Sequence, residues 1–447
     1  MIKIYDTMTR SLRDFVPLTE NVVNMYVCGP TVYNYIHIGN ARSAVAFDTI
    51  RRYFEYCGYT VNYISNFTDV DDKIIKAANE AGISTKELSD KFIAAFMEDT
   101  AQLGIKPATQ NPRVINYMDE IIAFVSTLVD KGFAYVSEGD VYFRVAKSNN
   151  YAKLANKTLE DLEIGASGRT DAETERKENP LDFALWKAAK EGEVSWDSPW
   201  GPGRPGWHIE CSVMATEILG DTIDIHGGGA DLEFPHHTNE IAQSEAKTGK
   251  TFANYWMHNG FVNVDNEKMS KSLGNFVTVH DMLKTVDGQV LRFFLATQQY
   301  RKPINFTEKA IHDAEVNLKY LKNTYSLPLT DQMNQDELQT YLEAFQTAMD
   351  DDFNTANGVT VLFDMAKWIN SGHYDQMVKD AFEKVLQVFG IVFKEEVLDE
   401  DIEKLIEERQ AARANKDFAT ADRIRDELAA QGIKLLDTKD GVRWTRD

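Results

Sequence analysis

Residues 25–42 constrain the fold more than any other stretch, because a strand signal there passes directly into a helix signal. The apolar run at 22–27 ends at Cys28-Gly-Pro30, which is typical of a buried strand stopped by turn residues. A helical pattern follows and ends at Gly58, a residue suited to a helix C-terminus. A strand that feeds a helix through a polar loop is half of a βαβ unit, and in open parallel sheets ligands bind just beyond the carboxyl ends of the strands. We therefore expect a ligand site at this loop.

The N-terminal 280 residues contain further strand and helix signals in alternation. The expected strands cover residues 2–5 (an edge strand), 59–65, 222–226 and 256–264. The expected helices cover residues 70–103, with Asp69 as N-cap, 115–132 and 235–247. Strands that alternate with helices predict an α/β fold class with a doubly wound, mostly parallel, Rossmann-like sheet.

Three other regions depart from this alternation. From about residue 135, short alternating runs and a Gly/Pro/Trp-rich passage at 196–207 indicate an insertion into the sheet domain. Beyond residue 277, apolar residues recur at three- and four-residue spacing, which predicts an α-helical bundle. A charged helix at 401–430 and a hairpin at 433–445 then predict a small mixed C-terminal domain.

Composition restricts the class of protein. The chain has 447 residues, 43% hydrophobic and 26% charged, so we expect several domains of ordinary globular type. It has no apolar run near 18 residues and no basic-then-apolar leader at Met1, so we expect a soluble, non-exported protein without a membrane partner. Three scattered cysteines suit a reducing compartment, where a loop cysteine is available as a ligand or nucleophile.

The net charge of −22, from 48 basic and 70 acidic residues, at first argues against a nucleic-acid partner. Half of it lies in residues 331–400, which hold 15 acidic and 4 basic side chains. The last 47 residues hold 11 acidic and 10 basic ones. The charge is therefore compatible with RNA bound away from the acidic segment.

Two short loops carry residues suited to phosphate chemistry. His37-Ile-Gly-Asn40 lies at a helix N-terminus, which favours an anion, although a histidine there is more often a surface or capping residue. The loop is neither a GxGxxG fingerprint nor a GxxxxGK[ST] loop. Lys268-Met-Ser-Lys-Ser272 offers two lysines, although most loops of this kind are merely solvated.

Zinc-binding residue types occur outside any CxxC motif, as Cys28, Cys211 and a histidine pair close to Glu240. His236 and Glu240 are four residues apart and share a helix face, whereas His237 and Glu240 are three apart and nearly do. Two thiols, an imidazole and a carboxylate make a reasonable zinc set, with buried or capping roles as the alternative. The residues alone do not choose between the two histidines.

Together the two loops resemble the signature pair of class I aminoacyl-tRNA synthetases, with Asn40 in place of that class's more common second histidine. Longer blocks resemble the cysteinyl-tRNA synthetase family, from the first strand through the last 40 residues. These blocks are Cys28-Gly-Pro-Thr-Val-Tyr33, Gly206-Trp-His-Ile-Glu-Cys-Ser212, Ile225-His-Gly-Gly-Gly-Ala-Asp-Leu-Glu-Phe-Pro-His-His237, Lys268-Met-Ser-Lys-Ser-Leu-Gly-Asn275 and Lys416-Asp-Phe-Ala-Thr-Ala-Asp-Arg423.

The resemblance implies ATP-dependent ligation of L-cysteine to tRNA(Cys) through a cysteinyl-adenylate. It also implies a cytoplasmic monomer with Mg²⁺ accompanying ATP and one Zn²⁺ per chain that selects the substrate thiolate. By resemblance, the zinc ligands are Cys28, Cys211, His236 and Glu240. The residues expected to bind ATP are His37, Gly39, Asn40, Gly228, Lys268 and Lys271, of which His37, Asn40, Lys268 and Lys271 are also expected to act in catalysis.

For the amino acid, the resemblance implies a pocket of Gly29, Thr68, Trp207 and Asp231, with Asp231 as partner of the ammonium group and His226 as a further candidate. Anticodon contacts are expected at Arg443 and Trp444, with Arg446 nearby, although packing within the small domain explains Trp444 equally well. The implied domains are two catalytic halves (1–125 and 206–265), a connective insertion (126–205), a signature-loop and stem-contact region (266–312), a helical bundle (313–400) and an anticodon-binding domain (401–447).

Two rival functions share some of these features. A cysteine ligase of thiol biosynthesis, which joins cysteine to an amino sugar, would have the same zinc and both signatures, but would not need the C-terminal region. A non-catalytic, zinc-stabilised RNA-binding relative would not need the histidine and lysines of the two loops.

Overall fold

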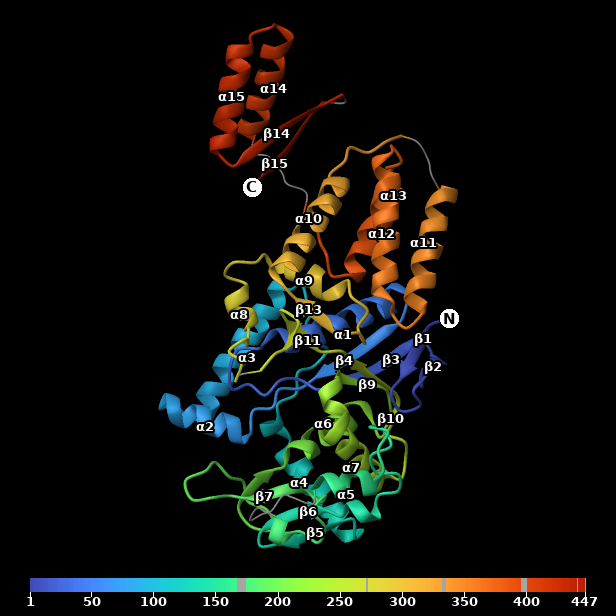
Figure 1. Ribbon diagram of the computed structural model, residues 1–447, viewed down its shortest axis with the longest axis vertical. Helices are drawn as coiled ribbons and strands as arrows, with labels where there is room; N and C mark the ends of the chain where they lie inside the picture. Colours follow the sequence, from blue (N-terminus) through green and yellow to red (C-terminus); the bar gives the residue numbers. More distant parts are fainter. Residues whose placement is uncertain (167–173, 271, 332–334, 395–399, 440, 447) are drawn as a thin grey trace. The chain divides into compact units, whose positions relative to one another are not determined.

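Four parallel strands form the central sheet of the computed structural model, in the order β10-β9-β3-β4 (Figure 1). They are β3 (Val22–Val27), β4 (Thr60–Ser65), β9 (Ile223–Gly229) and β10 (Ala253–Asn259). The structure describes residues 1–166, 174–270, 272–331, 335–394, 400–439 and 441–446. Because β3 pairs with both β4 and β9, strands from the two expected halves share one sheet.

Helices cover both faces of this sheet, which confirms the doubly wound α/β class. On one face lie α1 (Ile38–Tyr56) and α9 (Gly288–Ala296), and on the other lie α6 (Trp207–Leu219) and α7 (Thr238–Thr248) (Figure 1). Both faces of β3 are therefore covered, which explains why this strand is a nearly continuous apolar run rather than an alternating one.

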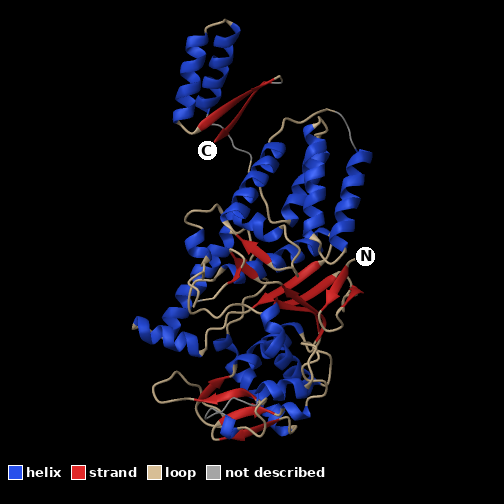
Figure 2. Cartoon of the chain, in the orientation of Figure 1, coloured by secondary structure: helices blue, strands red, loops and turns tan. Residues whose placement is uncertain are grey.

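The insertion between the two halves forms its own antiparallel sheet, in the order β5-β6-β7-β8 (Figure 2). Its strands are β5 (Ala134–Ser137), β6 (Asp140–Phe143), β7 (Phe183–Ala188) and β8 (Gly203–Pro205). Helix α4 (Met118–Asp130) packs against β5, and α5 (Leu159–Ala166) lies within the insertion. Helices α2 (Asp72–Ala81) and α3 (Thr85–Gln102), which precede the insertion, share a separate apolar cluster with Val32 and Phe67.

A small sheet after β10 leads into the helical region. Its strands are β11 (Val262–Val264), β12 (Glu267–Lys268) and β13 (Ile304–Phe306), in the order β12-β11-β13. The helices are α8 (Val279–Met282), α9, and the expected bundle of α10 (Glu308–Tyr325), α11 (Gln335–Asp350), α12 (Thr355–Asn370) and α13 (Gln376–Val388). None of the described helices is long and apolar enough to cross a membrane.

A buried ion pair fixes α1 to this helical region. Arg292 of α9 donates to Asp48 of α1 over 2.6 Å and to the Phe389 carbonyl, just after α13, over 2.9 Å. Arg52 binds the same Asp48 oxygen at 2.8 Å. Burial by itself raises the pKa of Asp48, but the two guanidinium groups outweigh it and the pKa falls below its usual value. Two buried or partly buried arginines therefore balance the negative charge of Asp48 on α1 inside the fold.

Residues Phe393–Asp447 form a second unit. Its elements are α14 (Glu400–Ala414), α15 (Phe418–Ala430) and the antiparallel hairpin β14 (Ile433–Thr438) and β15 (Gly441–Arg446). Ile402, Ile424, Leu428 and Ile433 form its core.

Capping residues differ from those expected in two places. Asp71, not Asp69, caps α2, because the Asp69 carboxylate binds Arg113 at 2.9 Å. The helix expected over 70–103 is two helices, since Gly82 adopts a left-handed φ of 68° and Ser84 then caps α3.

Other expected elements have different ends. The strand expected over 256–264 is β10 and β11, which belong to different sheets. The charged helix over 401–430 is broken where Asp417 caps α15. The expected N-terminal edge strand is β1 (Lys3–Asp6), which pairs with β2 (Ser11–Asp14) in a separate sheet. The helix expected to begin at 235 begins at Thr238 as α7, after a tight irregular turn.

Candidate active site and metal centre

A cleft of about 840 Å³ lies at the carboxyl ends of the central strands. The loops that follow β3, β9 and β10 all contribute to it. The expected site residues that line it are Cys28, Gly29, His37, Gly39, Asn40, Trp207, Asp231 and Lys268. Thr68 and Gly228 do not line the cleft, and Lys271 lies outside the described residues. The sheet therefore brings segments more than 200 residues apart into one site.

The cysteines and histidines form two possible metal-binding sets that share Cys28 and Glu240. One set adds Cys211 and His236, and the other adds His226 and His237; in each set all the ligand atoms lie within 4.8 Å of one another. The irregular turn Glu233–His237 points both neighbouring histidines inward, where both are at most 1% exposed. The structure thus explains why the sequence pattern did not separate His236 from His237.

Short distances connect the first set. The Cys28 Sγ lies 3.5 Å from the Cys211 Sγ and 3.3 Å from the Glu240 Oε1. The His236 Nε2 lies 2.9 Å from the same Glu240 oxygen, yet this buried nitrogen makes no hydrogen bond within the described part of the chain. A buried nitrogen that faces two thiols and a carboxylate without a hydrogen bond is suited to a metal ligand.

Electrostatics keep several members of this set ionised. Burial opposes the charge on Glu240, but His226 and His236 outweigh it and lower the pKa of the carboxyl to about 2. Burial likewise opposes the charge on His236, but Glu240 and Cys211 raise its pKa to about 10. For Cys211, burial opposes ionisation, but the hydrogen bond from Cys28 and the neighbouring His236 together outweigh it and lower the pKa to about 6. Burial raises the pKa of Cys28 well above its usual value. At neutral pH the set therefore carries two negative charges and one positive charge.

Two further histidines, which the sequence did not indicate, contact the two candidate ligand histidines. The Nδ1 of His236 lies 2.9 Å from the Nδ1 of His208, and the Nδ1 of His237 lies 2.8 Å from the Nε2 of His258. In metal sites, such partners on the second ring nitrogen fix the orientation of the ligand. His258 lies near the carboxyl end of β10, and this position is the sequence feature from which its place in the site could have been predicted.

Asn66 is another residue that the sequence did not indicate. Its Oδ1 accepts hydrogen bonds from the Tyr26 hydroxyl and the Gly29 backbone, both at 3.0 Å, and lies 3.7 Å from the Cys211 sulfur. Asn66 directly follows β4, so its place at a strand carboxyl end was again the signal. It holds the Cys28 loop in position.

The side of the cleft where ATP is expected begins at the N-terminus of α1. His37 is the N-cap: its Nδ1 accepts from the Asn40 backbone N–H at 3.2 Å, and the Asn40 Oδ1 accepts from the His37 backbone N–H at 3.1 Å. This reciprocal pair is a capping box. Asn40 therefore has an identifiable structural role that the loop sequence did not reveal.

The two signature loops are joined by backbone hydrogen bonds. Ile38 N–H donates to the Val277 carbonyl at 3.1 Å, and Val279 N–H donates to the Ile36 carbonyl at 2.9 Å. Within the second loop, the Asn275 Oδ1 accepts from Ser270 N–H at 2.9 Å. Lys268 lines the same cleft as His37.

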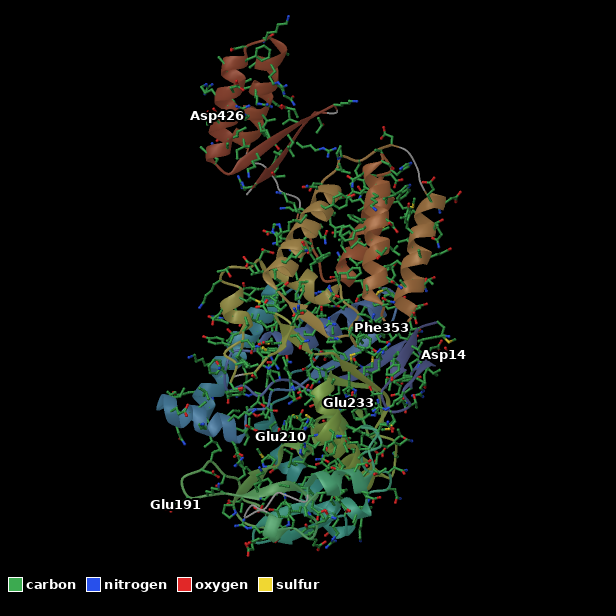
Figure 3. The ribbon with its side chains drawn as sticks, viewed as in Figure 1. Asp14, Glu191, Glu210, Glu233, Phe353 and Asp426 are labelled. Carbon is green, nitrogen blue, oxygen red and sulfur yellow. The ribbon has the colours of Figure 1, made fainter. Side chains whose placement is uncertain are left out.

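The residues expected to hold the amino acid lie at different depths. Trp207 is 40% exposed, lines the cleft and stacks on His236 at a centroid distance of 4.2 Å. Thr68 is buried behind the cleft, where its hydroxyl donates to Glu210 of α6 (labelled in Figure 3) at 3.4 Å. His226 is fully buried and binds Glu240 at 2.6 Å, so it supports the metal-binding set rather than lining the cleft.

In the second unit, the hairpin places Arg443 and Trp444 on opposite faces. Trp444 pairs with Leu435 and packs against the core of the unit, together with Leu435. Arg443 pairs with Leu436, which is 54% exposed. Arg446, opposite Ile433, shares the Trp444 face. The packing interpretation of Trp444 thus has a structural basis.

Comparison with known families divides the chain into three matched regions. Residues 14–316 match the family described as tRNA synthetases class I (C) catalytic domain. Residues 344–395 match the DALR domain, and residues 395–444 match the cysteinyl-tRNA ligase anticodon binding domain.

Individual proteins are similar over their whole length. A cysteine–tRNA ligase of Streptococcus thermophilus (strain CNRZ 1066) is 94% identical over 447 residues, and one of Streptococcus agalactiae serotype V is 83% identical; in both cases each chain is covered completely. Among solved structures, Mycobacterium tuberculosis methionyl-tRNA synthetase in complex with methionyl-adenylate is similar with a TM-score of 0.58 at 15% identity, covering 82% of this chain and 88% of the other. A putative arginyl-tRNA synthetase from Campylobacter jejuni has a TM-score of 0.54, covering 84% and 94%.

Proposed function

The chain belongs to the cysteinyl-tRNA ligase family of class I aminoacyl-tRNA synthetases, and from that premise we propose that it charges tRNA(Cys) through a cysteinyl-adenylate. In the first step a carboxylate oxygen of cysteine attacks the α-phosphorus of ATP, and the bond to the β-phosphate breaks to release pyrophosphate. In the second step the 2′-hydroxyl of the terminal adenosine of tRNA attacks the acyl carbon, AMP leaves, and the hydroxyl proton is lost to solvent.

One observation carries this proposal: Cys28 of the metal-binding set and the capped N-terminus of α1 line the same cleft. Cys28 and His37 are nine residues apart, at the two ends of one strand-to-helix loop. A substrate that presents a thiol at one end and reacts with a triphosphate at the other fits this arrangement. The first step needs positioning and charge stabilisation more than covalent help from the protein.

The donor set fits zinc. Cys28, Cys211, His236 and Glu240 supply two sulfurs, an imidazole nitrogen and a carboxylate oxygen, all close together and nearly all buried. Bound there, zinc would favour the ionised thiol of a substrate over an alcohol, which is far too basic to ionise near neutral pH. Shape alone discriminates between such similar groups by about 1–3 kcal/mol, so a metal that selects the thiolate explains how serine is rejected without an editing site.

The chain's own residues have separate roles in this proposal. His37 binds the phosphates of ATP at the N-terminus of α1, and Asn40 keeps His37 in place through the capping box. Lys268, with Lys271, stabilises the charge that develops on pyrophosphate, and Mg²⁺ accompanies ATP. Asp231 binds the substrate ammonium, and Trp207 covers the amino acid from the cleft side.

A family match at residues 395–444 to an anticodon binding domain favours tRNA over an amino sugar as acceptor. The proposal is tested by incubating the protein with labelled cysteine, ATP and tRNA, with an amino sugar as competing acceptor. We expect label on tRNA only. Label on the amino sugar would support the thiol-biosynthesis ligase instead, and no label on either would support a non-catalytic relative.

Zinc uptake should release about two protons at pH 7, because Cys28 and His236 hold protons in the metal-free set and zinc ligands must be deprotonated. Below their pKa values the protons of both groups compete with the metal, so zinc affinity rises with pH by about tenfold per unit for each proton, or about 100-fold per unit near neutrality. Calorimetry in buffers of different ionisation enthalpy measures the proton release, and zinc uptake without proton release would contradict the assigned set.

The same set predicts which cysteine matters for zinc. Cys28→Ser should lower the zinc content of the protein, and Cys57→Ser should not.

Asn40→Ala should slow cysteine-dependent ATP–pyrophosphate exchange by about 10- to 100-fold, because His37 loses the group that holds it. Asn40→Asp keeps an acceptor for the His37 N–H but places a negative charge beside the phosphates, so its main effect should be a higher KM for ATP. Asn34→Ala is the matched control, because Asn34 also lines the cleft and, among the described residues, its side chain accepts from the neighbouring Tyr35 N–H rather than holding His37. Equal effects of Asn40→Ala and Asn34→Ala would contradict the positioning role.

Arg443→Ala should raise the KM for tRNA by about tenfold and leave pyrophosphate exchange unchanged, because its face of the hairpin is the one turned away from the core. Trp444→Phe, which keeps an aromatic ring in that core, should change neither by more than about twofold. A loss of tRNA affinity in Trp444→Phe equal to that in Arg443→Ala would instead assign Trp444 to direct RNA contact.

A further inference from the structure

Three side chains from three elements meet beside the junction of the two signature loops. The ring of Tyr35, just before α1, stacks on the imidazole of His280 in α8, with centroids 4.1 Å apart and planes 12° apart. The His280 Nδ1 lies 3.2 Å from the Asp99 Oδ1 of α3. Phe92, also of α3, closes the group with an edge contact to Tyr35 at 5.2 Å. We call Tyr35, His280 and Asp99 the clasp.

The position of the clasp follows from the backbone pairing of the loops. His37 and Thr278 are paired antiparallel, with one backbone hydrogen bond from Ile38 to Val277 on one side of the pair and one from Val279 to Ile36 on the other. One residue farther along this register, Tyr35 lies opposite His280. Directly opposed aromatic side chains stabilise antiparallel pairs, so the clasp extends the backbone pairing by a side-chain contact.

The carboxylate end of the clasp depends on His280. The Asp99 side chain is 2% exposed, and its Oδ2 has no hydrogen-bond partner among the residues that the structure describes. His280 is the side chain that binds its Oδ1. Removing the hydrogen-bond partner of a buried carboxylate costs free energy, because the charge is then left without compensation. The contact between α3 and α8 is therefore strongly favoured once the chain is folded.

The second signature loop, which carries Lys268 and is called the lysine signature loop below, is held less firmly at its N-terminal end. Lys268 lies in β12, which has two residues, both exposed, and pairs with β11 at the edge of the small sheet. The clasp side instead joins residues 277–280 to the first signature loop, and through His280 to α3. Residues 277–280, which follow the lysine signature loop, therefore set the distance between His37 and that loop.

We propose that the clasp is a positioning device that fixes the lysine signature loop relative to His37, and that the adenylate-forming step depends on it more than transfer to tRNA does. The assignment of the two steps rests on the proposed function. Neither His280 nor Asp99 lines the cleft, so both act through the loops they hold. Adenylate formation requires the lysine signature loop, whereas transfer to tRNA starts from a finished adenylate. A loss of positioning should therefore slow the first step alone, whereas general destabilisation of the fold should slow both.

The test compares His280→Leu, which loses both contacts, with His280→Phe, which keeps the ring stack, and His280→Asn, which keeps a hydrogen bond to Asp99. We expect His280→Leu to lower kcat for ATP–pyrophosphate exchange by about 10- to 100-fold, with single-turnover transfer from purified adenylate complex within about twofold. The other two variants should lie between it and the unaltered protein. His312→Leu is the matched control, since His312 is an exposed helix histidine whose Nδ1 lies 3.8 Å from Glu315.

A second measurement needs no activity: the rate at which trypsin cuts after Lys268 in the folded full-length protein. We expect this cut to be about tenfold faster in His280→Leu and in Asp99→Asn, which preserves side-chain volume, and unchanged in His312→Leu. Equal slowing of exchange and transfer, or an unchanged rate of cutting in both clasp variants, overturns the proposal. If the unaltered protein makes no adenylate, the proposed function fails, whereas the trypsin comparison still decides whether the clasp holds the loop.

Discussion

The parallel pairing of β3 with β9 is the constraint on which both half-sites depend. A buried carboxylate sets its register: Asp224, at the start of β9, accepts from the backbone N–H groups of Leu18 and Asn24, each at 2.8 Å. In a sheet buried on both faces, a slip of one residue would turn every side chain of β3 to the wrong face. With the register fixed, Cys28 emerges from β3 directly beside Glu240.

The interior behind Cys28 is polar, and its buried side chains contact one another closely. His226, Glu240, His236 and His208 form one chain of close contacts, and His237, His258 and Thr7 form another. Burial first, and then the neighbouring histidines, hold the pKa of His237 well below its usual value, so this ring remains neutral beside the ionised Glu240. Such a cluster contributes less stability than an apolar core of similar volume, and the proposed metal site would account for its presence.

Much of this arrangement was predictable, because the informative signals were local. Apolar runs bounded by turn residues indicated the strands of the sheet, and residues at strand carboxyl ends indicated the site. Caps and side-chain orientations that depend on tertiary contacts could not be predicted from the sequence. Asp69 looks like a better cap than Asp71 until Arg113 binds it, and His236 and His237 are equivalent in a helical pattern until an irregular turn points both inward. For Trp444 the sequence left RNA contact and packing equally open, and its cross-strand pairing with Leu435 places the ring against the core of its unit.

The hydrogen bonds between His37 and Asn40, which stands where the class more commonly has a histidine, fix the tautomer of the His37 ring. A backbone N–H can only donate, so the bond from Asn40 N–H requires the Nδ1 of His37 to be an acceptor, and the ring proton of the neutral imidazole then sits on Nε2. The Asn40 amide oxygen fixes the other half of the pair by accepting from the His37 backbone. An amide does not titrate near neutral pH, so this half of the cap is independent of pH. His37 is thereby held in the tautomer that donates from Nε2, which is the form suited to a phosphate oxygen.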